Sequence, residues 1–141
     1  MPPFLTRNMR GETDSELAFH VFLQHLYRDG TLNDPALSAE RLGDYLRALD
    51  QGVSGQAAVA MCVTNGQTMA MINRGVATHY SLREGIPGCG EHTSPEPQLH
   101  ARFKGVMLGA EMADPGHQWR EVADGSLITV SRELELKVQL L

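Results

Sequence analysis

Apolar residues recur at steps of three and four between Asp14 and Tyr27, which is the pattern of an amphipathic helix. Thr13 precedes this segment and Glu16 follows three residues later, so the pair fits a capping box at a helix start. The Asp29-Gly30 pair supplies a stop signal. The apolar positions are Leu17, Ala18, Val21, Phe22, Leu23 and Leu26. The pattern predicts a helix over residues 14–27.

A second helical pattern runs from Ser38 to Leu49, and Ser38 is a suitable N-cap residue. Its apolar residues fall on one face and are Leu42, Tyr45, Leu46 and Leu49. Gly52 and Gly55 follow and are expected to end the helix. We therefore expect a second helix that buries this single face.

Shorter alternating runs then replace the helical pattern. Residues 56–64 carry apolar side chains at nearly every position, which predicts a strand buried on both faces. Asn65-Gly66 is a strong turn signal, and residues 67–73 supply a second strand. The segment 56–73 is therefore predicted to be a β-hairpin.

Three further strands are predicted in the second half of the chain, at residues 104–111, 126–131 and 134–140. The last two form a pair around a turn at Arg132-Glu133, and the glycine- and proline-rich segment 85–97 is typical of an exposed loop. Two helices followed by antiparallel strands indicate the α+β class, with helices layered on a sheet.

Composition narrows the classes of function. The 141 residues are enough for one domain with its own core, and the net charge of −5 offers no basic surface for nucleic acid. No apolar run approaches the roughly 20 residues of a membrane span, and the amino terminus does not resemble a signal peptide. We expect a single cytoplasmic domain over residues 1–141 that binds neither nucleic acid nor membrane.

The segment from Gly11 to Glu16 is the first candidate for chemistry. It reads Gly-Glu-Thr-Asp-Ser-Glu, and it brings carboxylates, hydroxyls and free backbone N–H groups together at the start of the first predicted helix. Such a turn suits the ammonium and carboxylate of a zwitterion. Capping boxes are common, however, so simple capping explains the same residues.

This segment resembles the G-x-[ST]-D-[ST]-E motif of class II glutamine amidotransferases, which are N-terminal-nucleophile hydrolases. Further along, the chain is similar to that family in its hairpin at Asn65-Gly66, in a strand that leads to Glu111, in Trp119 and in the Gly125-Ser126-Leu127 step. The order of these features matches over most of the chain. The resemblance implies an αββα layered sandwich, of which this chain would form part.

The resemblance also implies roles for single residues. Asp14 would bind the α-amino group of glutamine or of another γ-glutamyl compound, Thr13 would shape the turn, and Glu111 would lie near the rim of the pocket. A carboxylate is physically suited to pair with an ammonium group in a desolvated pocket. Neither a cofactor nor a metal ion is implied.

The sequence departs from the family at its amino-terminal side. The family uses an N-terminal cysteine as nucleophile, whereas this chain starts Met1-Pro2-Pro3, and it also lacks the His-Asn-Gly segment of the oxyanion hole. We expect the carboxyl portion of the domain, as a fragment, a split subunit or a degenerate homologue, and no catalytic residue is assigned. The alternative is a noncatalytic interaction or regulatory half-domain that pairs with a synthase subunit or with a second copy.

Two rival sites involve Cys89. The thiol of Cys89 is close in sequence to His92, which could activate it as a nucleophile, and both residues with His100 could hold a metal ion. The spacing fits no common zinc motif, and the glycine-rich surroundings favour an ordinary loop cysteine. Cys62 and Cys89 are expected to be free thiols.

Overall fold

The computed structural model describes residues 1–53, 58–85, 102–109 and 118–141, with the side chain of Val53 left out. The helices are α1 (Pro3–Asn8), α2 (Asp14–Arg28) and α3 (Ala39–Val53). The strands are β1 (Val59–Thr64), β2 (Met69–Arg74), β3 (Thr78–Glu84), β4 (Lys104–Gly109), β5 (Arg120–Val122), β6 (Ser126–Val130) and β7 (Leu136–Leu140). Helices followed by strands confirm the predicted α+β class.

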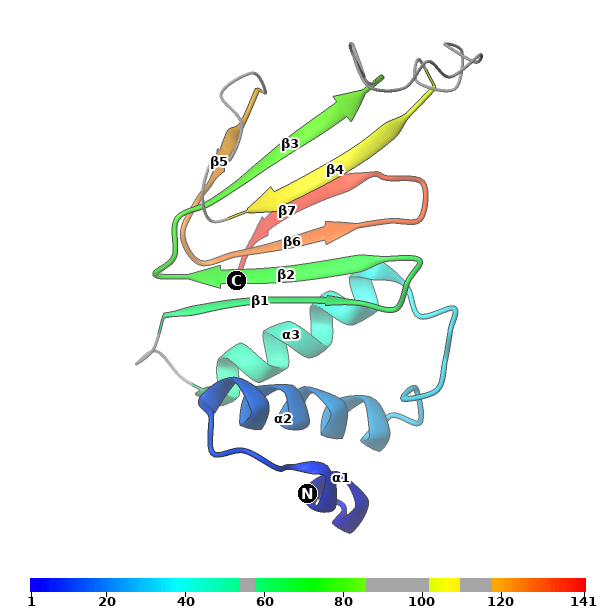
Figure 1. Cartoon of the computed structure of the whole chain (residues 1–141), viewed down its shortest axis with the longest axis vertical. Helices are drawn as coiled ribbons and strands as arrows, with labels where there is room; N and C mark the ends of the chain where they lie inside the picture. The colour runs from blue at the N-terminus through cyan, green and yellow to red at the C-terminus, as the bar shows by residue number, and fades with distance from the viewer. Residues whose placement is uncertain (54–57, 86–101, 110–117) are drawn as a thin grey trace.

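The strands form two antiparallel sheets, which Figure 1 shows above the helices. The first sheet has the order β1-β2-β6-β7, and the second has the order β4-β3-β5. Each pair of neighbouring strands is antiparallel. The chain enters the second sheet through β3, returns to the first through β6, and leaves β1 and β7 as the edges of the first sheet.

The larger core lies between the helices and the first sheet. Helix α3 packs against β2 and β6, whereas α2 packs against α3 and α1. The buried residues of this core are Phe22, Leu26, Leu37, Leu42, Tyr45, Leu46, Leu49, Val63, Ala70, Ile72 and Leu127. The predicted apolar face of the second helix is therefore confirmed, since all four of its residues are buried here.

A smaller core forms around Met71, Val122 and Ile128, with Tyr80 and Leu108 packed against it. These residues come from both sheets, so the second sheet covers part of the face of the first that points away from the helices. The described residues thus form three layers, a helix layer and two sheets. Within them, no helix covers the outer face of the second sheet, so the four-layer sandwich that the family resemblance implies is not established.

The helix predicted over residues 14–27 is confirmed as α2, and the predicted hairpin is confirmed as β1 and β2, with small shifts of their bounds. The burial of the strand predicted over residues 56–64 differs from expectation. Only one face of β1 is covered, because Ala60, Cys62 and Thr64 are exposed while Val63 is buried. The prediction of burial on both faces was wrong. The reason is that β1 is an edge strand, and the second core gathers over β2 and β6 rather than over β1.

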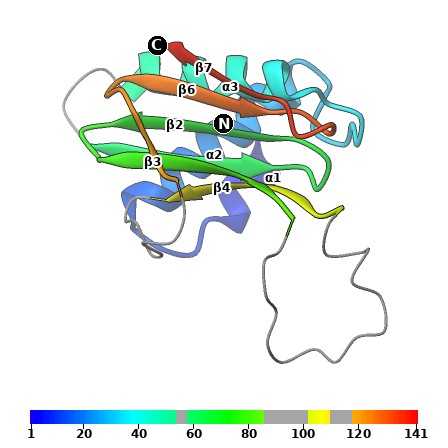
Figure 2. The same cartoon turned by 90° about the horizontal axis from the view of Figure 1, so that it is seen from above.

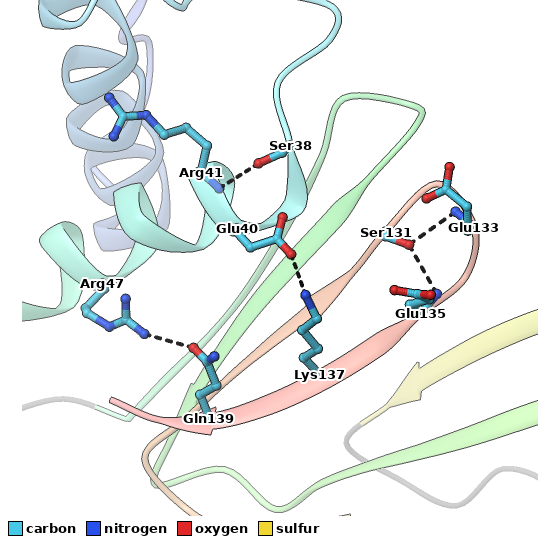
Figure 3. A network of polar contacts seen from close by, with 9 residues as sticks. All are labelled: Ser38, Glu40, Arg41, Arg47, Ser131, Glu133, Glu135, Lys137 and Gln139. Carbon is cyan, nitrogen blue, oxygen red and sulfur yellow. Dashed lines mark hydrogen bonds and ion pairs between the residues drawn. The ribbon is translucent and has the colours of Figure 1, made fainter.

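The opposite edge of the first sheet is tied to the helix layer by polar side chains. Lys137 of β7 pairs with Glu40 of α3 at 2.8 Å, and Arg47 of α3 donates to Gln139 at 3.4 Å (Figure 3). The pair lowers the pKa of Glu40, chiefly through the hydrogen bond from Lys137. One edge of the sheet is thus held to α3, whereas the β1 edge has no such contact with α3 in the described part of the chain.

Two glycines of α3 provide a matched test of how closely the helix packs on the sheet. A Cβ atom at Gly43 would lie 2.9 Å from Cδ2 of Leu127 and 3.1 Å from Cγ2 of Thr129, whereas one at Gly52 would have no neighbour within 4 Å. Gly52→Ala is expected to stabilise the protein by about 0.5–1 kcal/mol. Gly43→Ala is expected to destabilise it, because about 1–3 kcal/mol of overpacking exceeds the same gain. Urea denaturation checks the opposite signs, and equal shifts would contradict this packing.

No helix in the described ranges combines the length and the apolar character that a membrane crossing requires. Residues 86–97 of the predicted loop lie outside the described residues, so this loop stays a prediction. The last two residues of the strand predicted over 104–111 also lie outside them.

Candidate functional site

The turn before α2 is built around its N-cap residue. Thr13 has extended backbone angles, and its Oγ1 accepts a hydrogen bond of 3.3 Å from the backbone N–H of Glu16. The first turn carries Asp14 and Glu16, which suit the positive end of the helix dipole. The predicted capping role of Thr13 is therefore confirmed, because its hydroxyl oxygen accepts a hydrogen bond from the first turn of the helix.

Glu16 does not complete the capping box that the sequence predicts. Instead of turning to the N–H of Thr13, its carboxylate accepts from the backbone N–H groups of Arg10 at 2.8 Å and of Gly11 at 2.6 Å. A Cβ atom at Gly11 would lie 2.6 Å from Oε2 of Glu16. Glycine at this position thus lets the backbone before α2 approach the carboxylate. The carboxylate of Glu16 therefore binds the backbone that leads into α2 and is not available to a ligand.

These contacts make helix entry sensitive to pH. The N–H group of Arg10, followed by that of Gly11, lowers the pKa of Glu16 below its ordinary value of 4.5. A lowered carboxyl pKa contributes stability that is present above the unfolded value and is lost as the pH falls through the folded value. The melting temperature of Glu16→Gln should therefore lie furthest below that of the wild type near neutral pH. The difference should close below pH 4.5, and a difference that is constant with pH would contradict the contact.

Asp14 is one of the residues that line a cavity of about 790 Å³ between α2, the end of α3 and β1. Apolar side chains of Leu17, Val21 and Met61 line much of it, together with Ser15 and His25. Among the described residues, no partner is seen for the Asp14 carboxylate, which is exposed. The described lining therefore combines apolar side chains with a carboxylate that has no partner among the described residues.

A second carboxylate in the cavity wall is already neutralised. Asp50 is buried at the end of α3, and it accepts two hydrogen bonds from the guanidinium of Arg74, one of them from Nε at 2.9 Å. Asp50 raises the pKa of Arg74, first through these bonds and then through its charge. Gly75 follows Arg74, and its backbone N–H donates a hydrogen bond of 2.6 Å to the carboxylate of Asp124. Asp50 thus fixes the end of β2 and leaves Asp14 as the carboxylate able to take a cation.

The site favours a ligand with an ammonium group and a short uncharged body. Asp14 supplies an acceptor for the ammonium, and Ser15, on the same lining, supplies a hydroxyl that has no partner among the described residues. The described part of the chain contains no group of three His, Cys, Asp or Glu side chains that could hold a metal ion. The arrangement is therefore suited to binding a cationic ligand.

Several residues singled out by sequence lie elsewhere. Glu111, Cys89, His92 and His100 lie outside the described residues, so the rim position and both rival sites stay predictions. Cys62 is a free thiol on the exposed face of β1, and partial desolvation raises its pKa, which favours the unreactive thiol. The Asp50–Arg74 pair was missed, because the two residues end different elements and no motif connects them.

Comparison with known proteins supports the fold. No protein-family model and no curated protein matches the sequence. The structure is similar to that of a glutamine aminotransferase class-II domain protein from Silicibacter pomeroyi, with a TM-score of 0.59 and 18% sequence identity. The match covers 99% of this chain but only 56% of that chain. The two proteins thus share an arrangement of helices and strands, and this chain spans little more than half the length of its neighbour.

Proposed function

We propose that this chain is the carboxyl portion of a class II glutamine amidotransferase-like domain, and that Asp14 binds the α-ammonium group of glutamine or of another γ-glutamyl compound. In the complete domain, an N-terminal-nucleophile hydrolase of αββα layering, the amide would be hydrolysed to glutamate and ammonia. The nucleophile and the oxyanion hole for that step would come from a segment other than residues 1–141. The fold similarity and the Gly11–Glu16 motif both support this proposal.

The observation that carries the proposal is the difference between the acidic side chains around the cavity. Glu16 accepts two backbone N–H groups, and Asp50 is paired with Arg74, so each has a structural task. Asp14 lies two residues before Glu16 in the first turn of α2, and its carboxylate has no hydrogen-bond or ion-pair partner within the described residues. A carboxylate that lines a cavity at a helix start, with no cation beside it in the described residues, is suited to a cationic ligand.

The direct test is isothermal titration of glutamine and glutamate into the wild-type protein and into Asp14→Asn. Binding is expected to be weak, with a Kd on the order of millimolar, because one charged contact dominates it. Asp14→Asn should weaken binding about tenfold or more, the equivalent of 1.4 kcal/mol.

Glu12→Gln is the matched control, since Glu12 is an exposed acid two residues away that does not line the cavity. It removes the same charge from the same turn and should leave the affinity within about twofold of the wild type. Equal losses in the two variants would show that general charge, and not Asp14, is responsible. Equal affinities of wild type and Asp14→Asn would remove Asp14 from the binding role.

A second candidate function is a noncatalytic interaction or regulatory half-domain that pairs with a synthase subunit or with a second copy of the chain. The observation in its favour is the uncovered face of β1 at the edge of the first sheet. Sedimentation velocity separates the two ideas. A monomer that binds glutamine favours the first function, whereas association without glutamine binding favours the second.

A further inference from the structure

The cavity beside Asp14 continues along an open edge of the first sheet. Strand β1 is hydrogen-bonded to β2 on one side and has no neighbouring strand on the other within the described ranges. Val59, Ala60 and Met61 of this strand line the cavity together with α2. The cavity is thus a groove lined by α2, the end of α3 and the first half of β1, and the outer edge of β1 is unpaired within the described ranges.

The register of the hairpin shows which backbone groups lie on that edge. Asn65 donates its N–H to the carbonyl of Thr68, and the pairing continues regularly from Thr64 opposite Met69 to Val59 opposite Arg74. In an antiparallel ladder the backbone groups of alternate residues point toward the partner strand and away from it. Counting back from Asn65, the N–H and C=O groups of Ala60, Cys62 and Thr64 point outward.

The helix layer extends beyond this edge. Helix α3 packs against β2 and β6, whereas the main contacts of α2 are with α3 and α1. Of the strands, β1 lies nearest to α2, since Val59 and Met61 pack against the core to which α2 contributes. In Figure 2 the blue helices α1 and α2 reach past the side of the sheet that is opposite β7. Leu17 of α2 is 48% exposed although it faces the groove. The helix thus presents an apolar surface where one more strand would lie.

We propose that the β1 edge accepts one extended strand from a partner polypeptide, whose alternate side chains are apolar and whose flanks are basic. The strand would extend the first sheet by hydrogen bonding to Ala60, Cys62 and Thr64. Its apolar side chains would fill the groove against Leu17 and Val21 of α2. Recognition by strand addition takes its affinity from the main chain and its specificity from alternate side chains.

Charge supports basic flanks. Asp14 is the unpaired charge of the described groove lining, since Arg74 neutralises Asp50, and neither lysine nor arginine is among the described lining residues. The whole chain also carries a net charge of −5. An acidic strand would be repelled, whereas lysines at the ends of the donor strand would be attracted. The charge complementarity therefore selects among strands of equal apolar pattern.

The overhang of α2 argues against a second copy as the donor. Two copies joined through β1 about a two-fold axis would place both helix layers on the same face of the joined sheet. Each α2 would then extend into the space of the other helix layer, since it reaches past the β1 edge (Figure 2). A single strand that carries no helix layer of its own would avoid this clash.

The test uses a peptide of alternating valine and threonine flanked by lysine pairs, titrated by fluorescence anisotropy into the full chain. Two peptides serve as controls, one of the same composition with the valines grouped, and one with glutamate in place of lysine. Each control should bind about tenfold more weakly than the first peptide, or worse. If the peptide with grouped valines binds as tightly as the first peptide, the proposed strand pairing is wrong. If the glutamate peptide binds as tightly, the proposed preference for basic flanks is wrong.

Hydrogen exchange locates the bound peptide. The outward amides of Ala60, Cys62 and Thr64 should exchange fast in the free protein and become protected in the complex. Those of Met61 and Val63, which point to β2, should be slow in both states. Protection elsewhere, or none, would overturn the proposal.

Cys62→Pro removes one outward N–H group without removing a bond to β2, and an edge strand tolerates proline at such a position. Peptide binding should fall about tenfold or more, whereas Cys62→Thr should keep it. If Cys62→Pro fails to fold, N-methylation of alternate peptide residues tests the same bonds on the ligand. Unchanged binding by both N-methylated registers would overturn the proposal. Because the readouts need no glutamine, failure of glutamine binding leaves this inference standing, and the reverse also holds.

Discussion

Leu46→Ala is expected to have the largest effect on stability, a loss of about 2–5 kcal/mol. Leu46 is 0% exposed and lies in the core that α3 forms with the first sheet. Truncation removes buried methyl groups and leaves a cavity that the surrounding helix and strands cannot close completely. Urea denaturation followed by circular dichroism measures the loss directly.

Leu140→Ala provides the control, because Leu140 is 72% exposed on β7. The same change of side chain there should alter the free energy of unfolding by less than about 0.5 kcal/mol. Similar losses at the two positions would mean that α3 does not pack on the sheet as described. The helix layer that positions Asp14 would then have no support.

Asn73→Ala is expected to cost about 2–3 kcal/mol, the second largest effect. Asn73 is fully buried on β2, and its Oδ1 accepts the N–H of Ser126 at 2.9 Å while its Nδ2 donates to the carbonyl of Ala123 at 3.4 Å. Its own carbonyl accepts the N–H of Gly125 at 3.0 Å. The side chain therefore fixes the turn that leads into β6, and alanine would leave two backbone groups unpaired.

Ser126→Ala is the matched comparison, since Ser126 lies directly opposite Asn73 and is also fully buried. Its Oγ has no hydrogen-bond partner among the described residues, so removal of the hydroxyl should leave stability unchanged or raise it by up to about 1 kcal/mol. Thermal unfolding of both variants checks the contrast. Equal destabilisation would show that the Asn73 side chain does not hold the turn.

The elements that the sequence predicted well are those whose packing is local. Helices α2 and α3 have caps at Thr13 and Ser38, and their apolar spacing is regular, so both helices and their starts were predicted correctly. The predicted end of the second helix was wrong, because α3 continues through Gly52 to Val53. The hairpin was predicted for the same reason. Asn65 accepts from the N–H groups of Gln67 and Thr68, and Gly66 has a φ of 85°, which glycine adopts without strain.

The elements that the sequence did not predict are either too short to show a pattern or are defined by contacts distant in sequence. Helix α1 has six residues and buries only Leu5, which is too short for a periodic pattern. Strand β3 mixes polar and apolar residues, and its pairing with β4 and β5 defines it. The three residues of β5 give no signal of their own.

The candidate site was predictable only in part. The motif indicated Asp14 as a binding residue, but helix capping explained its neighbours Thr13 and Glu16 equally well. The structure distinguishes the three residues, because Thr13 and Glu16 have backbone partners whereas Asp14 has none among the described residues. The groove itself depends on how α2 lies relative to β1, which no local pattern encodes. The neutral Asp50–Arg74 pair is likewise a product of tertiary packing.

The central claim is that Asp14 recognises an α-ammonium group, and a comparison of glutamine with N-acetylglutamine tests it most directly. Both ligands have the same side-chain amide, but the acetylated one lacks the cation. In ¹⁵N-resolved NMR titrations, glutamine is predicted to shift the amide signals of Asp14, Ser15 and Ala60 saturably, and N-acetylglutamine is predicted to leave them unchanged. Equal shifts by the two ligands, or no shift by either, would contradict the account.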